Sequence, residues 1–139
     1  MADNSEPRER LRFEDFELVR FPNGRSRIRV GMDWTQGRSY KGEAEGNQTL
    51  EGEVRAAAQA ALKAAAGAIG NRLRLDLRGA KAMRVFDSWV VVVMVWATGE
   101  GKTLHLLGAY PCPGEDTPRG AVMAVLDATN RVFVHYLEA

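Results

Sequence analysis

Residues 28–34 read IRVGMDW, and 62 residues later residues 90–96 read VVVVMVW. In both stretches apolar residues occupy every second position and a tryptophan comes last. Strict alternation of this kind is typical of a β-strand that buries one face. Two copies at this spacing favour a duplicated supersecondary unit, because a solenoid is built from a longer series of repeats.

The sequence around each copy follows the same plan. Each strand leads through a Gly-containing turn into a second strand-like run and then into an Ala-rich helical segment, and a further strand precedes it. The order strand-strand-strand-helix, used twice, predicts an α+β fold of duplicated βββα units. We expect two layers, with antiparallel sheets that carry their helices on one face. Residues 1–12 are predicted to be a disordered lead, and residues 13–139 to be a single domain.

Composition excludes several classes of function. The 139 residues include 19 basic and 18 acidic side chains, and this balance gives no electrostatic argument for binding nucleic acid or an anionic membrane. The longest apolar run, residues 89–97, is about half as long as a membrane helix requires. One cysteine, Cys112, permits no intramolecular disulfide. With no apolar leader at the N-terminus, we predict a cytoplasmic protein without a membrane partner.

No catalytic motif is recognisable. Residues 99–103 read GEGKT, like the end of a phosphate-binding loop, but Trp96 stands where that motif needs its first glycine. The expected structure there is a hairpin turn. His105, His135 and Cys112 are the residues that a small enzyme could use, and the sequence shows no further metal ligand beside them. We therefore predict no enzyme, no cofactor and no metal, with a small enzyme as the alternative.

The strand at residues 89–97 is apolar on both faces, whereas one layer of helices covers only one face of a sheet. An exposed apolar patch of this size is a liability for a lone molecule. The prediction is a homodimer whose interface contains Val90, Val92, Met94 and Trp96. Two alternatives are that the terminal segment of the same chain covers this face, or that the domain is a scaffold for another protein.

Two loops precede the expected helices and are candidate ligand contacts. The residues concerned are Gly46, Asn47, Thr49, Asp116 and Thr117. Free backbone N–H groups at a helix N-terminus suit a carboxylate ligand. The alternative is ordinary helix capping, which every helix needs.

The two units, the stretch GEAEG at residues 42–46 and the stretch AVLDATNR at residues 124–131 resemble the C-terminal regulatory domain of 2-isopropylmalate synthase, which citramalate synthase shares. The resemblance covers roughly residues 16–133. It implies a βββα duplicate that pairs as a dimer and binds an amino acid near the interface. Gly46 matches the family's first loop and Asp116 its second, while the catalytic barrel is absent. The expected function is a non-catalytic, dimeric regulatory or small-metabolite-binding domain, with an amino acid or a 2-oxo acid as ligand.

Overall fold

The computed structural model describes residues 10–34 and 37–137, and its elements follow the predicted order. Strands β1 (Leu11–Arg20), β2 (Arg25–Trp34) and β3 (Ser39–Asn47) precede helix α1 (Leu50–Ala68). Strands β4 (Arg74–Val85), β5 (Ser88–Gly99) and β6 (Lys102–Cys112) precede helix α2 (Thr117–Leu137). The α+β class and the duplicated βββα order are confirmed.

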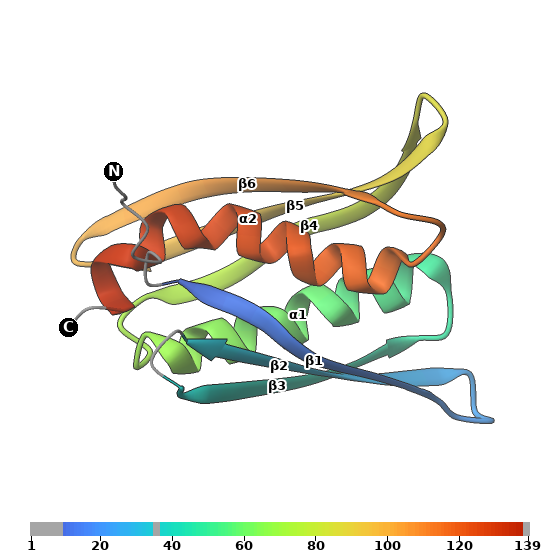
Figure 1. The fold of residues 1–139 in the computed structure, drawn as a ribbon, viewed down its shortest axis with the longest axis horizontal. Coiled ribbons are helices and arrows are strands. Elements are labelled where there is room, and N and C mark those ends of the chain that lie inside the picture. The colour runs from blue at the N-terminus through green and yellow to red at the C-terminus, as the bar shows by residue number, and fades with distance from the viewer. Residues whose placement is uncertain (1–9, 35–36, 138–139) are drawn as a thin grey trace, which may run out of the picture.

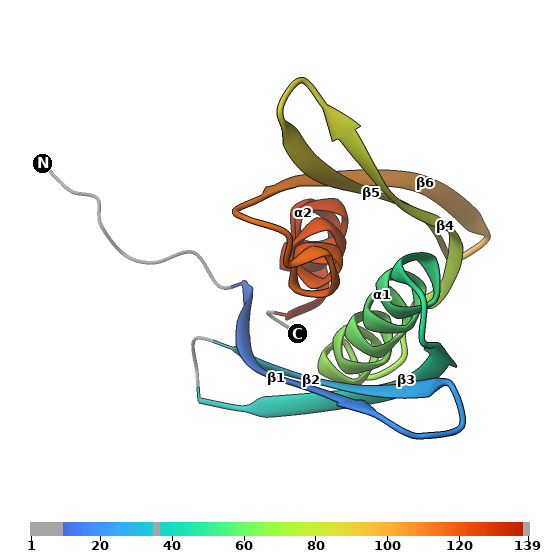
Figure 2. The same ribbon diagram turned by 90° about the vertical axis from the view of Figure 1, so that its right-hand side faces the viewer.

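The strands form two separate antiparallel sheets. Sheet A has the order β1-β2-β3 and sheet B the order β4-β5-β6. Both helices lie between the two sheets (Figures 1 and 2): α1 packs on β2 and β3, α2 packs on β5 and β6, and the helices pack on each other. Each unit thus has two layers with its helix on one face, as predicted. The two helix layers meet, so the whole molecule is a sandwich of sheet, helices and sheet.

The first strand begins earlier than the sequence suggested. Leu11 is 1% exposed and pairs with Trp34, although it falls in the segment predicted to be disordered. The side-chain amide of Asn130 on α2 accepts from the Leu11 N–H and donates to its carbonyl, both at 3.1 Å. These contacts satisfy the free edge of β1 at its start. Residues 1–9 of the predicted lead lie outside the described residues.

Close contact between helix and sheet defines equivalent positions in the two units. A Cβ atom added to Gly42 on β3 would lie 2.0 Å from the carbonyl oxygen of Ala60, and one added to Gly108 on β6 would lie 2.0 Å from that of Ala124. Glycine is therefore required at both positions. Because Gly42 pairs with Val30 and Gly108 pairs with Val93, these two valines are equivalent. The two units thus repeat each other in packing as well as in order.

This equivalence corrects the repeat read from the sequence. Val30 and Val93 are 63 residues apart, not 62, so residues 28–34 and 90–96 are out of register by one. The side chains that face the core from β2 are Ile28, Val30, Met32 and Trp34, and those that face it from β5 are Val91, Val93, Val95 and Ala97. A slip of one residue moves every side chain of a strand to its other face. Val90, Val92, Met94 and Trp96 therefore lie on the outer face of sheet B.

Local sequence explains the remaining irregularities. Glu100 and Gly101 both have positive φ, at 54° and 76°, which is the geometry of a tight hairpin turn. Lys102 then starts β6, so the predicted hairpin is confirmed and GEGKT does not lead into a helix. The register of β4 shifts between Leu77 and Gly79, which leaves Arg78 unpaired in a β-bulge. Neither helix, over its described residues, is long and apolar enough to cross a membrane.

Candidate functional site

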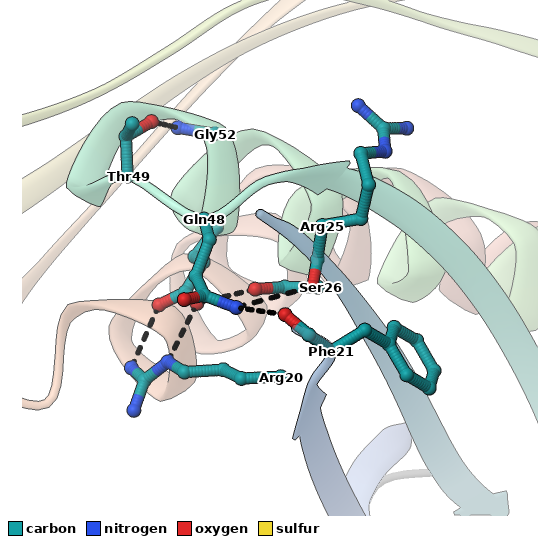
Figure 3. A network of polar contacts seen from close by, with 8 residues as sticks. Arg20, Phe21, Arg25, Ser26, Gln48, Thr49 and Gly52 are labelled. Carbon is teal, nitrogen blue, oxygen red and sulfur yellow. Dashed lines mark hydrogen bonds and ion pairs between the residues drawn. The ribbon is translucent and has the colours of Figure 1, made fainter. Parts of the chain in front are cut away.

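The loop before α1 is engaged in capping. The Thr49 hydroxyl accepts from the Gly52 N–H at 2.9 Å (Figure 3), and the Asn47 Oδ1 accepts from Nη1 of Arg25 at 2.9 Å. A side chain on Gly46 would come within 2.6 Å of the Gly52 carbonyl oxygen. Each residue predicted here thus has a structural role of its own.

Beneath this loop lies a polar network that the sequence did not predict. The buried Glu53 carboxylate accepts from Nε and Nη2 of Arg20, at 2.8 and 2.9 Å, and from the Ser26 hydroxyl at 2.6 Å. The hydrogen bond from Arg20 is the main reason that the pKa of Glu53 is lowered. Gln48 donates to the Phe21 and Arg25 carbonyls (Figure 3). The network fastens the β1–β2 hairpin to α1, and Ser26, a polar residue at an inward strand position, was its one visible signal.

The loop before α2 is also a cap. Oδ1 of Asp116 accepts from the Arg119 N–H at 3.4 Å, and the carboxylate forms an ion pair with that arginine at 3.0 Å. Thr117 is buried and is the first residue of the helix. Both helices begin at the same end of the molecule (Figure 1), so the two loops share that end. Thr49 and Asp116 thus cap the two helices and Asn47 bonds Arg25, and a ligand at these loops stays a prediction.

The structure does not assemble the residues of the alternative enzyme. Cys112 is buried on the inner face of β6 against Gly120 of α2, and burial raises the pKa of its thiol. His105 lies on the outer face of the same strand, seven residues away, which is about 23 Å along a strand. The side chain of His135 lies outside the described residues. Within the described part of the chain, no three His, Cys, Asp or Glu residues are grouped to hold a metal.

The most distinctive surface is the outer face of sheet B. We use this name for the outward side chains of β5 with their apolar neighbours on β4 and β6: Met83, Val90, Val92, Met94, Trp96, Leu107, Ala109 and Pro111. The four β5 residues are half-buried in the lone chain, and Leu107 is 54% exposed. No element of the described chain covers this side of the sheet (Figure 2).

Sheet A, built on the same plan, shows the opposite chemistry on its outer face. The outward residues there are mostly charged: Asp15, Glu17, Arg27, Arg29, Asp33, Lys41, Glu43 and Glu45. Arg29 at the centre pairs with Glu43 at 2.8 Å and with Glu17 at 3.7 Å. The equivalent position of sheet B is Val92. The two faces differ in chemistry although their backbones match, so the apolar face is a feature of sheet B and not of the fold.

At one end of this face three side chains form a stack. The Arg78 guanidinium lies 4.0 Å from the centre of the Trp96 ring, and the His105 ring is stacked on Trp96 at 4.4 Å and 15°. Arg78 is the unpaired residue of the β4 bulge, and pairing alone could not have placed it beside Trp96. The stack spans all three strands of sheet B.

The sequence matches no known protein-family model and no curated protein. The resemblance to the regulatory domain of 2-isopropylmalate synthase therefore stays a prediction.

Proposed function

We propose that the chain is a non-catalytic module that pairs with a second copy of itself through the outer face of sheet B. The observation that supports this is the contrast between the two sheets. Where the fold faces water, on sheet A, it carries a ladder of charged residues. On sheet B the same positions carry valine, methionine and tryptophan, a composition that favours contact with protein over contact with water.

The face is suited to pairing with itself. Along β5 the outward side chains run from small to large, from Val90 and Val92 to Met94 and Trp96. A twofold axis that lies in the interface, perpendicular to β5, sets the two strands antiparallel. Val90 then opposes Trp96 of the second copy, and Val92 opposes Met94, so that small side chains meet large ones throughout. Stacked sheets in proteins interdigitate their side chains in this way.

The described loops give a metabolite site less support, because their predicted residues are engaged in helix caps and in contacts within the chain. A regulatory role for the pair, with an amino acid or a 2-oxo acid as effector, is the wider hypothesis that the sequence resemblance adds. A scaffold that binds a different protein through the same face is the competing hypothesis. Self-pairing is favoured by the small-to-large gradient, which a foreign partner would not require.

Sedimentation velocity on the whole chain and on Val92→Asp tests the proposal. Val92 does not belong to the monomer's core, so the variant should fold with an unchanged circular dichroism spectrum. The new carboxylate would lie at the centre of the interface beside Lys81 and would lose its hydration when the second copy packs on it, which should raise the dimer dissociation constant at least ~100-fold.

Val19→Asp is the matched control, because Val19 points outward from sheet A beside Arg27. We expect this variant to remain a dimer. A wild-type chain that stays monomeric at high micromolar concentration, or a dimer that Val92→Asp leaves intact, would show that the proposed pairing is wrong.

A further inference from the structure

The β4–β5 hairpin ends in a tip, residues 84–89, that projects from the body of the molecule and mixes three apolar side chains with Arg84, Asp87 and Ser88. Phe86 at its turn is 97% exposed, and Val85 beside it is 37% exposed. Figures 1 and 2 show the tip rising from sheet B on the side away from the helices, which is the side of the outer face. The tip therefore points toward the space that a second copy would occupy.

The backbone of the tip makes this exposure more unusual. Phe86 has φ of +56°, in the left-handed region where glycine or asparagine is the ordinary choice. A bulky residue there costs free energy of backbone strain. In the lone chain the phenylalanine is exposed, so burial of its side chain does not offset this strain.

We infer that each hairpin tip is an arm that crosses the dimer and packs Phe86 against the Arg78–Trp96–His105 stack of the second copy. This inference rests on the proposed self-association. When β5 lies antiparallel on β5, Val90 sits over Trp96 of the other copy. Phe86, four residues beyond Val90, then lies past Trp96 at the end of the other sheet that carries the stack, and the tip, which rises toward the second copy, would bring its side chain back against that stack.

The area of contact supports the arm. Strands about 4.8 Å apart and residues about 3.3 Å apart give the three-stranded face of sheet B an area of roughly 500 Å² per copy. Two such faces together give about 1,000 Å², below the ~1,200–2,000 Å² of a stable interface. A buried aromatic side chain removes about 150–250 Å² of surface, so two arms and the surfaces they cover bring the total into that range.

The chemistry of the docking point also fits. Arg78 lies over the Trp96 ring and the His105 ring is stacked on it, so the docking point combines aromatic rings with a cation. A phenylalanine ring packs well edge-to-face in such a setting. The phenylalanine would also shield the cation–π pair from water, which strengthens that pair.

The first test measures the dimer dissociation constant by sedimentation equilibrium for the wild type, Phe86→Ser and Leu50→Ser. Leu50 is 45% exposed at the start of α1 and serves as the matched control for removing an exposed apolar side chain. We expect Phe86→Ser to weaken the dimer at least tenfold and Leu50→Ser to leave it unchanged.

The second test is disulfide trapping in a Cys112→Ala background, with Phe86→Cys and Thr103→Cys in the same chain. The two positions lie at opposite ends of sheet B, roughly 33 Å apart, far beyond disulfide reach, so only two chains can form the bond. We expect covalent dimers from this pair on mild oxidation. Phe86→Cys with Val19→Cys is the control and should give none.

The outcomes separate this inference from the proposed function. If Val92→Asp dissociates the dimer while Phe86→Ser does not and position 86 fails to cross-link to position 103, the arm is wrong and the pairing stands. If the wild type is monomeric, both the proposed pairing and the arm are wrong. Weakening by Phe86→Ser together with the specific cross-link supports the arm.

Discussion

At the scale of single residues, Glu53 shows how a charge can be buried in this fold. Its carboxylate accepts hydrogen bonds from Arg20 and Ser26, and the hydrogen bond from Arg20 is the first cause of its lowered pKa. The folded chain therefore binds a proton at Glu53 less readily than the unfolded chain does. The resulting stabilisation is complete above the ordinary carboxyl pKa of 4.5 and is lost as the pH falls through the lowered, folded-state pKa.

Glu53→Gln should remove this stabilisation. We expect the free energy of unfolding at pH 7 to fall by about 1.5–3 kcal/mol, the usual value of a hydrogen bond to a charged group. The difference from the wild type should shrink as the pH is lowered below the ordinary carboxyl pKa of 4.5. Urea denaturation in neutral and in acidic buffer measures both effects.

Glu51→Gln is the control for this prediction. Glu51 occupies the same first turn of α1 but is exposed, so the variant reports any effect of the helix dipole and spares the network. Equal losses from the two substitutions would mean that the dipole, and not Arg20 and Ser26, stabilises the Glu53 carboxylate.

At the scale of elements, each helix approaches its edge strand closely because that strand carries glycine at the contact. Gly42 faces Ala60 of α1, and Gly108 faces Ala124 and Ala128 of α2. The alanine-rich faces of both helices make this approach feasible. The same device in both units indicates that helix-on-sheet packing, rather than turn chemistry, fixes the shape of each unit.

Gly42→Ala and Gly108→Ala should each destabilise the fold by about 1–3 kcal/mol or more, because the new methyl group meets backbone oxygen that cannot yield without moving the helix. Gly79→Ala in β4 is the control, since a Cβ there has nothing within 4 Å. Thermal and urea unfolding of the three variants measures the effect. If Gly42→Ala and Gly108→Ala lower the free energy of unfolding no more than Gly79→Ala does, the close packing of helix on sheet is not what requires these glycines.

The elements themselves could be predicted because local pattern determines them. Alternation predicted the strands, the Ala-rich segments predicted the helices, and the Gly-Glu-Gly stretch predicted a hairpin turn. The register of the repeat could not be predicted, because residues 89–97 are apolar on both faces and alternation fits either one. The close contact of Gly108 with α2 shows which face points inward.

The candidate site likewise contains residues that the sequence predicted and residues that it did not. The four apolar β5 residues were predicted from composition alone, because a strand apolar on both sides needs two covers. Arg78, His105 and Phe86 were not placed with them. A bulge directs Arg78, cross-strand pairing directs His105, and the curl of the hairpin directs Phe86, and none of these leaves a periodic signal in the sequence.

At the scale of the whole molecule, the two sheets are a natural comparison in one chain. Each outer face has a central row of three cross-strand neighbours. On sheet A that row is Glu17, Arg29 and Glu43, and on sheet B it is Lys81, Val92 and Ala109. The first row forms ion pairs that suit water, and the second has an apolar centre and leaves only a lysine at one side.

If the apolar character of sheet B serves assembly alone, giving sheet B the row of sheet A should turn a dimer into a stable monomer. We expect the triple variant Lys81→Glu, Val92→Arg and Ala109→Glu to sediment as a monomer at concentrations where the wild type pairs. The new arginine would lie between two carboxylates, as Arg29 does. The free energy of unfolding should therefore stay within ~1 kcal/mol of that of the monomeric Val92→Asp chain.

Sedimentation velocity together with urea unfolding decides the matter. A triple variant that still dimerises would place the interface elsewhere on the molecule. One that unfolds would mean that the outer face contributes to the stability of the single chain, and the parallel with sheet A would then not extend to energetics. A triple variant that is monomeric and stable would show that the three side chains of the central row determine whether the outer face of sheet B binds a second copy or faces water, as that of sheet A does.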